Sequence, residues 1–213
     1  MVTDTISGIG SPGQGITFEV EQVTFAGTTR QHHMFGYVGH CLTIPWNQSG
    51  RYIVSMRTDF YTRLPNPGET ADIVIIDTSN GYEVTPVDTT RAWNLQKGTM
   101  LFWNPHEPET QFFFNDRDPV TGDIFTVLYD ISNMERIREY RFKPSPITIA
   151  NTGVAPDGSN FAAVNHGRNS WRKVVSYAGA MDETLRGPSN PTTDGLFKVD
   201  IATGERTLLA SYD

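Results

Sequence analysis

Hydrophobic runs recur along the chain, and three of them end at an aspartate that is followed by a short polar turn. These runs occupy residues 72–77, 124–130 and 196–200, and a second run follows each turn, at residues 82–87, 135–140 and 206–210. Two alternating runs separated by turn residues such as Asn-Gly or Thr-Gly are typical of a β-hairpin. The pattern therefore predicts one hairpin unit repeated three times, which indicates a repeat architecture.

Each hairpin belongs to a longer unit of four strands, which predicts an all-β fold made of β-propeller blades, each a four-stranded antiparallel sheet. We expect residues 1–14 to form a disordered lead-in and residues 15–213 to form the blades, with one extra strand at 17–25. The expected strands are 40–45, 51–57, 72–77 and 82–87 in blade one (about 40–87), 99–103, 111–116, 124–130 and 135–142 in blade two (about 99–142), and 147–154, 160–166, 195–201 and 206–211 in blade three (about 147–211).

Three blades are too few to close a ring, because propellers close with about four to eight blades. The sequence therefore predicts either a partial ring that belongs to a longer chain or a ring completed by another copy. Both alternatives leave blade faces exposed, so self-association through those faces is expected.

Composition and charge support this fold class and narrow the partners. The chain has 19 glycines and 13 prolines in 213 residues, and turn dipeptides such as Asn80-Gly81 separate the apolar runs, which favours sheet over helix. A net charge of −7 argues against a nucleic-acid partner, because such proteins need an excess of Lys and Arg. No run is long enough to span a membrane and no signal-peptide pattern begins the chain, so no membrane association and a cytoplasmic location are expected.

The connecting segments differ in length between the two ends of the expected blades. Short turns at 46–50, 155–158 and 202–204 fall at one end, here called the short-turn end. Long segments at 25–40, 58–70, 88–98 and 169–194 fall at the other, here called the long-loop end. Because long loops on a rigid scaffold usually carry function, we assign binding to the long-loop end.

Four arginines are expected at the long-loop end. Three of them lie at or just past the end of the second strand of their blade, and one lies between blades: Arg57, Arg117, Arg168 and Arg91. The planar guanidinium group matches carboxylate, sulfate or phosphate, so the set predicts an anionic ligand. The alternative is that these arginines pair with neighbouring aspartates such as Asp116 and Asp118 and brace the blades.

Four of the five histidines are also expected there: His32, His33, His40 and His166. Imidazole groups act as general base or acid near neutral pH and also bind divalent metals. His33, His40 and His166, with Arg117 and Arg168, are therefore the catalytic candidates. His32 and His33 are the candidate ligands for a divalent metal, although their spacing matches no zinc motif. A hydrogen-bonded structural role is the alternative for each histidine, and no cofactor follows with certainty.

Aromatic and amide side chains complete the predicted site. Sugar rings are commonly held by an aromatic face together with hydrogen bonds to their hydroxyl groups. The candidate substrate-binding residues are Arg57, Arg91, Trp93, Asn94, Gln96 and Tyr177.

Several segments resemble bacterial β-propeller proteins related to oligogalacturonate lyases and propeller-type ulvan lyases. These segments are His32–Tyr37, Pro45-Trp46, Trp93–Gly98, Asn115–Arg117, Val154–Gly158 and Asp194–Glu205. The Pro-Asp-Gly and Asp-x-x-Thr-Gly elements occur in many propellers, whereas the His-His and Trp-Asn segments are more particular. The resemblance covers residues 30–212 and implies a complete ring about twice this length, of which this chain is the first part.

The resemblance implies β-elimination on a uronic acid, in which a cation neutralises the carboxylate, a base removes the proton beside it and an acid assists the leaving oxygen. We therefore expect an anionic, uronate-containing oligosaccharide as partner, with Arg117 and Arg168 at its carboxylate or sulfate. A non-catalytic propeller that binds proteins or glycans is an alternative of another class. A phosphoester hydrolase with a histidine-bound metal is a third.

Overall fold

The computed structural model describes residues 3–8, 16–24, 32–36, 44–143, 147–168, 177–180 and 192–213. Within these ranges the chain forms strands and turns and contains no α-helix, which confirms the predicted all-β class. The described segments include no helix that could cross a membrane.

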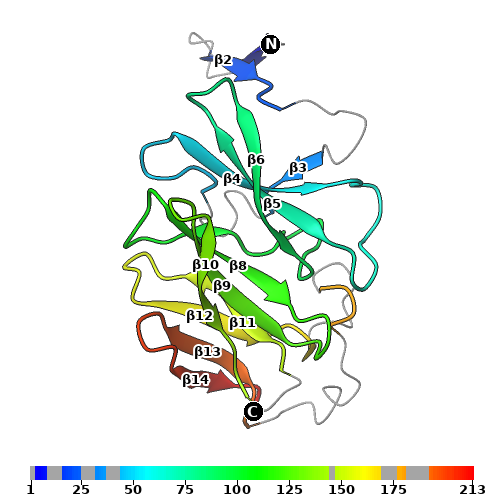
Figure 1. The fold of residues 1–213 in the computed structure, drawn as a ribbon, viewed down its shortest axis with the longest axis vertical. Helices are drawn as coiled ribbons and strands as arrows, with labels where there is room; N and C mark the ends of the chain where they lie inside the picture. The colour runs from blue at the N-terminus through cyan, green and yellow to red at the C-terminus, as the bar shows by residue number, and fades with distance from the viewer. Residues whose placement is uncertain are drawn as a thin grey trace.

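Three four-stranded antiparallel sheets make up most of the described chain (Figure 1). Blade one contains β3 (His32–Met34), β4 (Tyr52–Thr58), β5 (Ala71–Asp77) and β6 (Glu83–Thr90). Blade two contains β7 (Phe102–Trp103), β8 (Gln111–Arg117), β9 (Ile124–Asp130) and β10 (Glu135–Tyr140). Blade three contains β11 (Ile149–Val154), β12 (Asn160–Asn165), β13 (Gly195–Asp200) and β14 (Arg206–Ser211). Neighbouring strands in each sheet are consecutive in sequence, as expected for propeller blades, and the three sheets do not close into a ring.

The first strand of blade one differs from the expected segment 40–45. The strand that pairs with β4 is β3, and residues 44 and 45, the only described part of that segment, are not in a strand. The N-terminal segment differs as well, because β1 (Thr3–Gly8) is a strand within the predicted disordered lead-in 1–14. It pairs with β2 (Ile16–Glu21), which overlaps the strand predicted at 17–25. In Figure 1 this hairpin lies beyond blade one.

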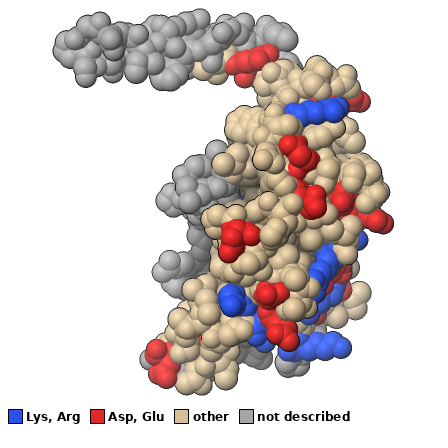
Figure 2. All heavy atoms as spheres, turned by 90° about the vertical axis from the view of Figure 1, so that its left-hand side faces the viewer, with Lys and Arg blue, Asp and Glu red and all other residues tan. Residues whose placement is uncertain are grey.

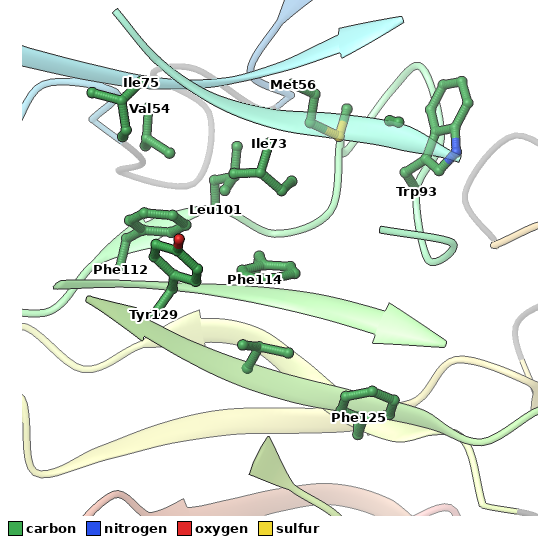
Figure 3. Close-up of a cluster of buried hydrophobic side chains, with 12 residues drawn as sticks. Val54, Met56, Ile73, Ile75, Trp93, Leu101, Phe112, Phe114, Phe125 and Tyr129 are labelled. Atoms are coloured by element: carbon green, nitrogen blue, oxygen red, sulfur yellow. The ribbon is translucent and has the colours of Figure 1, made fainter. Parts of the chain in front are cut away.

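Apolar residues on the facing sides of the blades hold the stack together. Alternate residues of a strand point to the same side of the sheet, so Val54 and Ile73 of blade one meet Phe112 and Phe114 of blade two (Figure 3). A second cluster, which includes Phe113 and Phe161, joins blades two and three. The hydrophobic alternation along the chain therefore encodes the contacts between blades.

The repeated aspartates close the turn after the third strand of each blade. Each side-chain carboxylate accepts a backbone N–H from two or three residues further on, which is an Asx-type turn. The three pairs are Asp77 with Ser79 (2.9 Å), Asp130 with Ser132 (2.8 Å) and Asp200 with Thr203 (2.7 Å). The repeat seen in the sequence is thus a structural repeat at the short-turn end.

Strand direction separates the two ends of the stack as the sequence predicted. The β13–β14 turn and the other short turns lie on the left in Figure 1, and the ends of β4, β8 and β12 lie on the opposite side. Figure 2 looks onto the short-turn end, where acidic and basic side chains are interspersed.

Candidate functional site at the long-loop end

The three arginines lie at the long-loop end, but they are not at equivalent positions of their blades, and their partners differ. Counted on from the residue that pairs with the turn aspartate, Arg57 is five residues along, Arg117 six and Arg168 eight. Arg57 lies in β4 and Arg117 ends β8, whereas Arg168 lies just past the end of β12. Arg57 donates to Asp72 with an Nη2–Oδ2 distance of 2.8 Å, and Arg168 donates to Asp194 with an Nε–Oδ2 distance of 2.6 Å. Each pair joins neighbouring strands of one blade, which is the bracing role given above as the alternative.

Arg117 contacts main-chain carbonyls instead of a carboxylate. Its guanidinium group donates to the carbonyls of Ala178 at 2.9 Å and Gly122 at 3.3 Å. Its neighbour on the next strand is Ile124, and in the strand register the counterpart of Arg57 is Asp116. Among the described residues Arg117 has no carboxylate partner, and burial lowers its pKa. Its positive charge is therefore not neutralised by the part of the chain that the structure describes.

Arg91 is half-buried and contributes its main-chain N–H, which donates to Asp116 at 2.9 Å. The same carboxylate binds Arg136, which also binds Asp88 of blade one. Burial opposes the charge of Arg136, but the two aspartates raise its pKa above the ordinary value. Arg136, which the sequence analysis did not single out, is thus the brace between blades one and two.

His166 is buried at the junction of blades two and three, with 2% of its surface exposed. Its Nδ1 lies 2.9 Å from Nζ of Lys97, and its Nε2 lies 3.3 Å from the carbonyl oxygen of Asn151. Because an ammonium group can only donate, Nδ1 accepts from a charged Lys97 and Nε2 carries the ring proton. Burial, and then the charge of Lys97, hold the pKa of His166 well below its ordinary value. The imidazole is therefore neutral, and both of its nitrogens are engaged.

Lys97 is a functional candidate that the sequence analysis missed. It is 7% exposed, and its Nζ lies 3.8 Å from the centre of the Tyr177 ring. Burial lowers the pKa of Lys97 to about 7, and no carboxylate among the described residues offsets this effect. A lysine buried without an acidic partner is unusual, and perturbed groups of this kind gather at functional sites.

The backbone around Lys97 is fixed by a capped turn and by two glycines. Asn94 is fully buried, and its side-chain oxygen accepts the N–H groups of Gln96 at 2.9 Å and Lys97 at 2.8 Å. A Cβ on Gly98 would lie 2.6 Å from the carbonyl oxygen of Phe35, so the two backbones pack too closely for any other residue. The Asn94 oxygen therefore holds the turn that carries Lys97, while Gln96 is exposed, and the substrate-binding role of both residues stays a prediction.

The predicted aromatic platforms are buried. Trp93 is 1% exposed, and its indole N–H donates to the carbonyl of Glu69 at 2.8 Å. Tyr177 is also 1% exposed, its hydroxyl accepts from Asn115 at 3.0 Å, and its ring lies 4.8 Å from that of His166. Neither ring offers the stacking face that the sequence predicted, because the segments that carry them fold into the junctions between blades.

The predicted metal pair does not converge on one point. His32 and His33 are consecutive in β3, and consecutive strand residues point to opposite faces. His32 packs against Tyr61, with 4.5 Å between ring centres, and neither ring nitrogen of His33 has a hydrogen-bond partner among the described residues. No group of three metal-binding side chains comes together in the described ranges, and His40 lies outside them.

No profile of a known protein family matches this chain, and no curated protein matches its sequence. The fold is similar to a solved structure described as an oligogalacturonate lyase in complex with manganese, with a TM-score of 0.52 and 13% sequence identity. The match covers 99% of this chain and 48% of the lyase, so the chain spans about half the length of that protein. This likeness confirms the propeller fold and the expected resemblance at the level of fold.

Proposed function

We propose that this chain belongs to a β-propeller that binds a uronate-containing anionic oligosaccharide and cleaves it by β-elimination. The supporting observation is the difference between the partners of three arginines at the long-loop end. Arg57 and Arg168 are neutralised by aspartates, whereas Arg117 binds only main-chain carbonyls among the described residues. A half-buried cation with no counter-ion among the residues that the structure describes favours an anion at the long-loop end.

The chemistry of a uronate explains why such a cation matters. Removal of the proton beside the carboxylate places negative charge on that carboxylate, and a fixed positive group lowers the energy of this state. Arg117 suits the task, because its planar donors match a carboxylate and its partial burial limits screening by water. The manganese of the similar lyase enters no step here, because the described residues offer no matching group of ligands.

The test is to incubate the purified chain with polygalacturonate, ulvan and glycosaminoglycan fragments and to follow the ultraviolet absorbance of the unsaturated product. We expect turnover with at least one polymer and a loss of about 100-fold in kcat/KM for Arg117→Ala, the size typical of removing one donor to a developing anion. Arg51→Ala is the matched control, because Arg51 is paired with Asp77 at the short-turn end. Absence of product with every polymer would contradict the proposed cleavage.

A glycan-binding protein without catalysis is the second candidate, and one observation favours it. Both nitrogens of His166 are engaged in hydrogen bonds, so this imidazole is not available as a free base. This alternative predicts that the oligosaccharide binds, that binding is lost in Arg117→Ala, and that no product forms.

A further inference from the structure

The cluster around Lys97 brings together side chains from three separate segments. Lys97 lies in the connection before β7, His166 follows β12, and Tyr177 lies in the described segment 177–180. Asn115 of β8 joins the cluster, because its amide donates to the Tyr177 hydroxyl and to the carbonyl of Asn151. The chain therefore holds one amine in a buried polar site without a described acidic partner.

Lys97 is the member of this cluster that can exchange a proton. His166 uses Nδ1 for Lys97 and Nε2 for a carbonyl, so neither nitrogen is available. Lys97 has three N–H donors when charged, and of the described groups only His166 accepts one of them in a hydrogen bond. It is also the most exposed of the three, at 7% against 2% for His166 and 1% for Tyr177.

Among the described charged and titratable groups around Lys97, the charge that changes near neutral pH is that of Lys97 itself. His166 and Tyr177 contact it directly, and burial and Lys97 itself keep His166 neutral. Arg117 reaches the same segment through the carbonyl of Ala178 and stays charged, while Asp116 of β8 is paired with Arg136. Burial lowers the pKa of Lys97 to about 7, close to the value that suits a general base.

We propose that Lys97 takes the proton from the carbon beside the substrate carboxylate, and that His166 is the positioning residue that aims its amine. This inference rests on the proposed function. In the step, the C–H bond breaks and its proton moves to the neutral amine of Lys97. The electron pair forms the new carbon–carbon double bond, and the bond to the leaving oxygen breaks. The ammonium group then returns the proton to that oxygen, which restores the neutral amine.

Titration of the lysines tests the first half of the inference without any substrate. The chain has four lysines, Lys97, Lys143, Lys173 and Lys198. Lysine labelled with ¹³C at Cε therefore gives four resonances, which single substitutions assign. We expect the Lys97 signal to titrate near pH 7. A Lys97 midpoint near 10.5, the ordinary value for a lysine, would overturn the inference.

Substitution of His166 tests the positioning role in the same experiment. His166→Leu removes the acceptor of the ammonium group and should lower the midpoint of Lys97 further, because hydrogen bonding to the charged form raises a pKa. His166→Gln keeps a side-chain oxygen that can accept the bond and should restore the midpoint. Equal midpoints in native protein, His166→Leu and His166→Gln would show that His166 does not act on Lys97.

The pH profile of turnover tests the second half. We expect kcat/KM to rise as the pH increases through about 7 and Lys97 becomes neutral. Lys97→Met should lower it by about 100-fold or more, and Lys97→Arg should not restore it, because arginine stays charged. Lys198→Met is the control for loss of a lysine. Turnover with an unchanged profile in Lys97→Met would overturn the catalytic role alone. If native protein shows no turnover while Lys97 titrates near pH 7, the proposed function and this catalytic step are both overturned. Only the conclusion that burial lowers the pKa of Lys97 would then stand.

Discussion

Replacement of Lys97 by methionine should change how the stability of the protein depends on pH. The unfolded chain holds a proton on this lysine up to about pH 10.5, whereas the folded protein releases it near pH 7 because burial lowers the pKa. Between these two values the unfolded state binds more protons, so stability rises with pH across this window. Below about pH 7 the lysine is protonated in both states, and its contribution to the slope disappears.

The magnitude follows from the width of that window. Each pH unit over which the two states differ by one proton contributes about 1.4 kcal/mol. The interval from about 7 to 10.5 therefore corresponds to about 5 kcal/mol in the free energy of unfolding, of which about 2 kcal/mol falls between pH 7 and 9, because the folded state is still half protonated at pH 7. Methionine has a similar length and no charge, so Lys97→Met removes this contribution and should flatten the profile.

The assay is urea unfolding followed by tryptophan fluorescence at pH 6, 7, 8 and 9 for native protein, Lys97→Met and the exposed control Lys198→Met. From pH 7 to pH 9 the free energy of unfolding of native protein should rise by about 2 kcal/mol relative to that of Lys97→Met. Lys198→Met should parallel the native profile. Parallel profiles for native protein and Lys97→Met would refute the conclusion that burial neutralises this lysine.

Three further substitutions test the scaffold. Arg136→Ala should lower the free energy of unfolding by about 2 kcal/mol, because it leaves two partly buried aspartates without their common partner. A loss below about 0.5 kcal/mol in urea unfolding would indicate that water screens these ion pairs as it does on an exposed surface. Met134→Gly should stabilise the protein by about 1 kcal/mol and raise Tm, because this exposed residue has a φ of 56°, in the left-handed region that is costly for a residue with a side chain. An unchanged or lower Tm would show that the backbone is not strained there. Gly98→Ala should lower the free energy of unfolding by about 2 kcal/mol or more, because the added Cβ would lie 2.6 Å from the carbonyl oxygen of Phe35. Native stability in this variant would contradict the close approach of the two backbones.

Much of the fold could be predicted because the repeated unit is local in sequence. Asp77, Asp130 and Asp200 close similar turns, and the alternating runs before them encode both the strands and the apolar faces between blades. The first strand of blade one could not be predicted in the same way. The three residues of β3 form a strand only because they pair with β4, which follows after a long connection.

The candidate site depends on contacts that no sequence pattern reveals. Trp93 and Tyr177 lie in segments that resemble exposed loops, yet both rings are buried at junctions between blades. A single lysine next to a glycine matches no functional motif, so the sequence did not single out Lys97. Its environment arises from the close approach of Gly98 to Phe35 and from His166, which is 69 positions away in the chain. Arg117 could be placed at the long-loop end from the strand pattern, whereas its contacts with the carbonyls of Gly122 and Ala178 depend on the folded structure.

The central proposal is that the long-loop end binds an anionic sugar through Arg117, a cation that has no carboxylate partner in the described part of the chain. Isothermal titration calorimetry with an oligogalacturonate and with its methyl-esterified, uncharged form tests this claim most directly, in native protein and in Arg117→Ala. The account predicts that native protein binds the charged form, that binding weakens at high salt, and that Arg117→Ala loses it. Equal binding of the charged and esterified forms, or unchanged binding by Arg117→Ala, would contradict it.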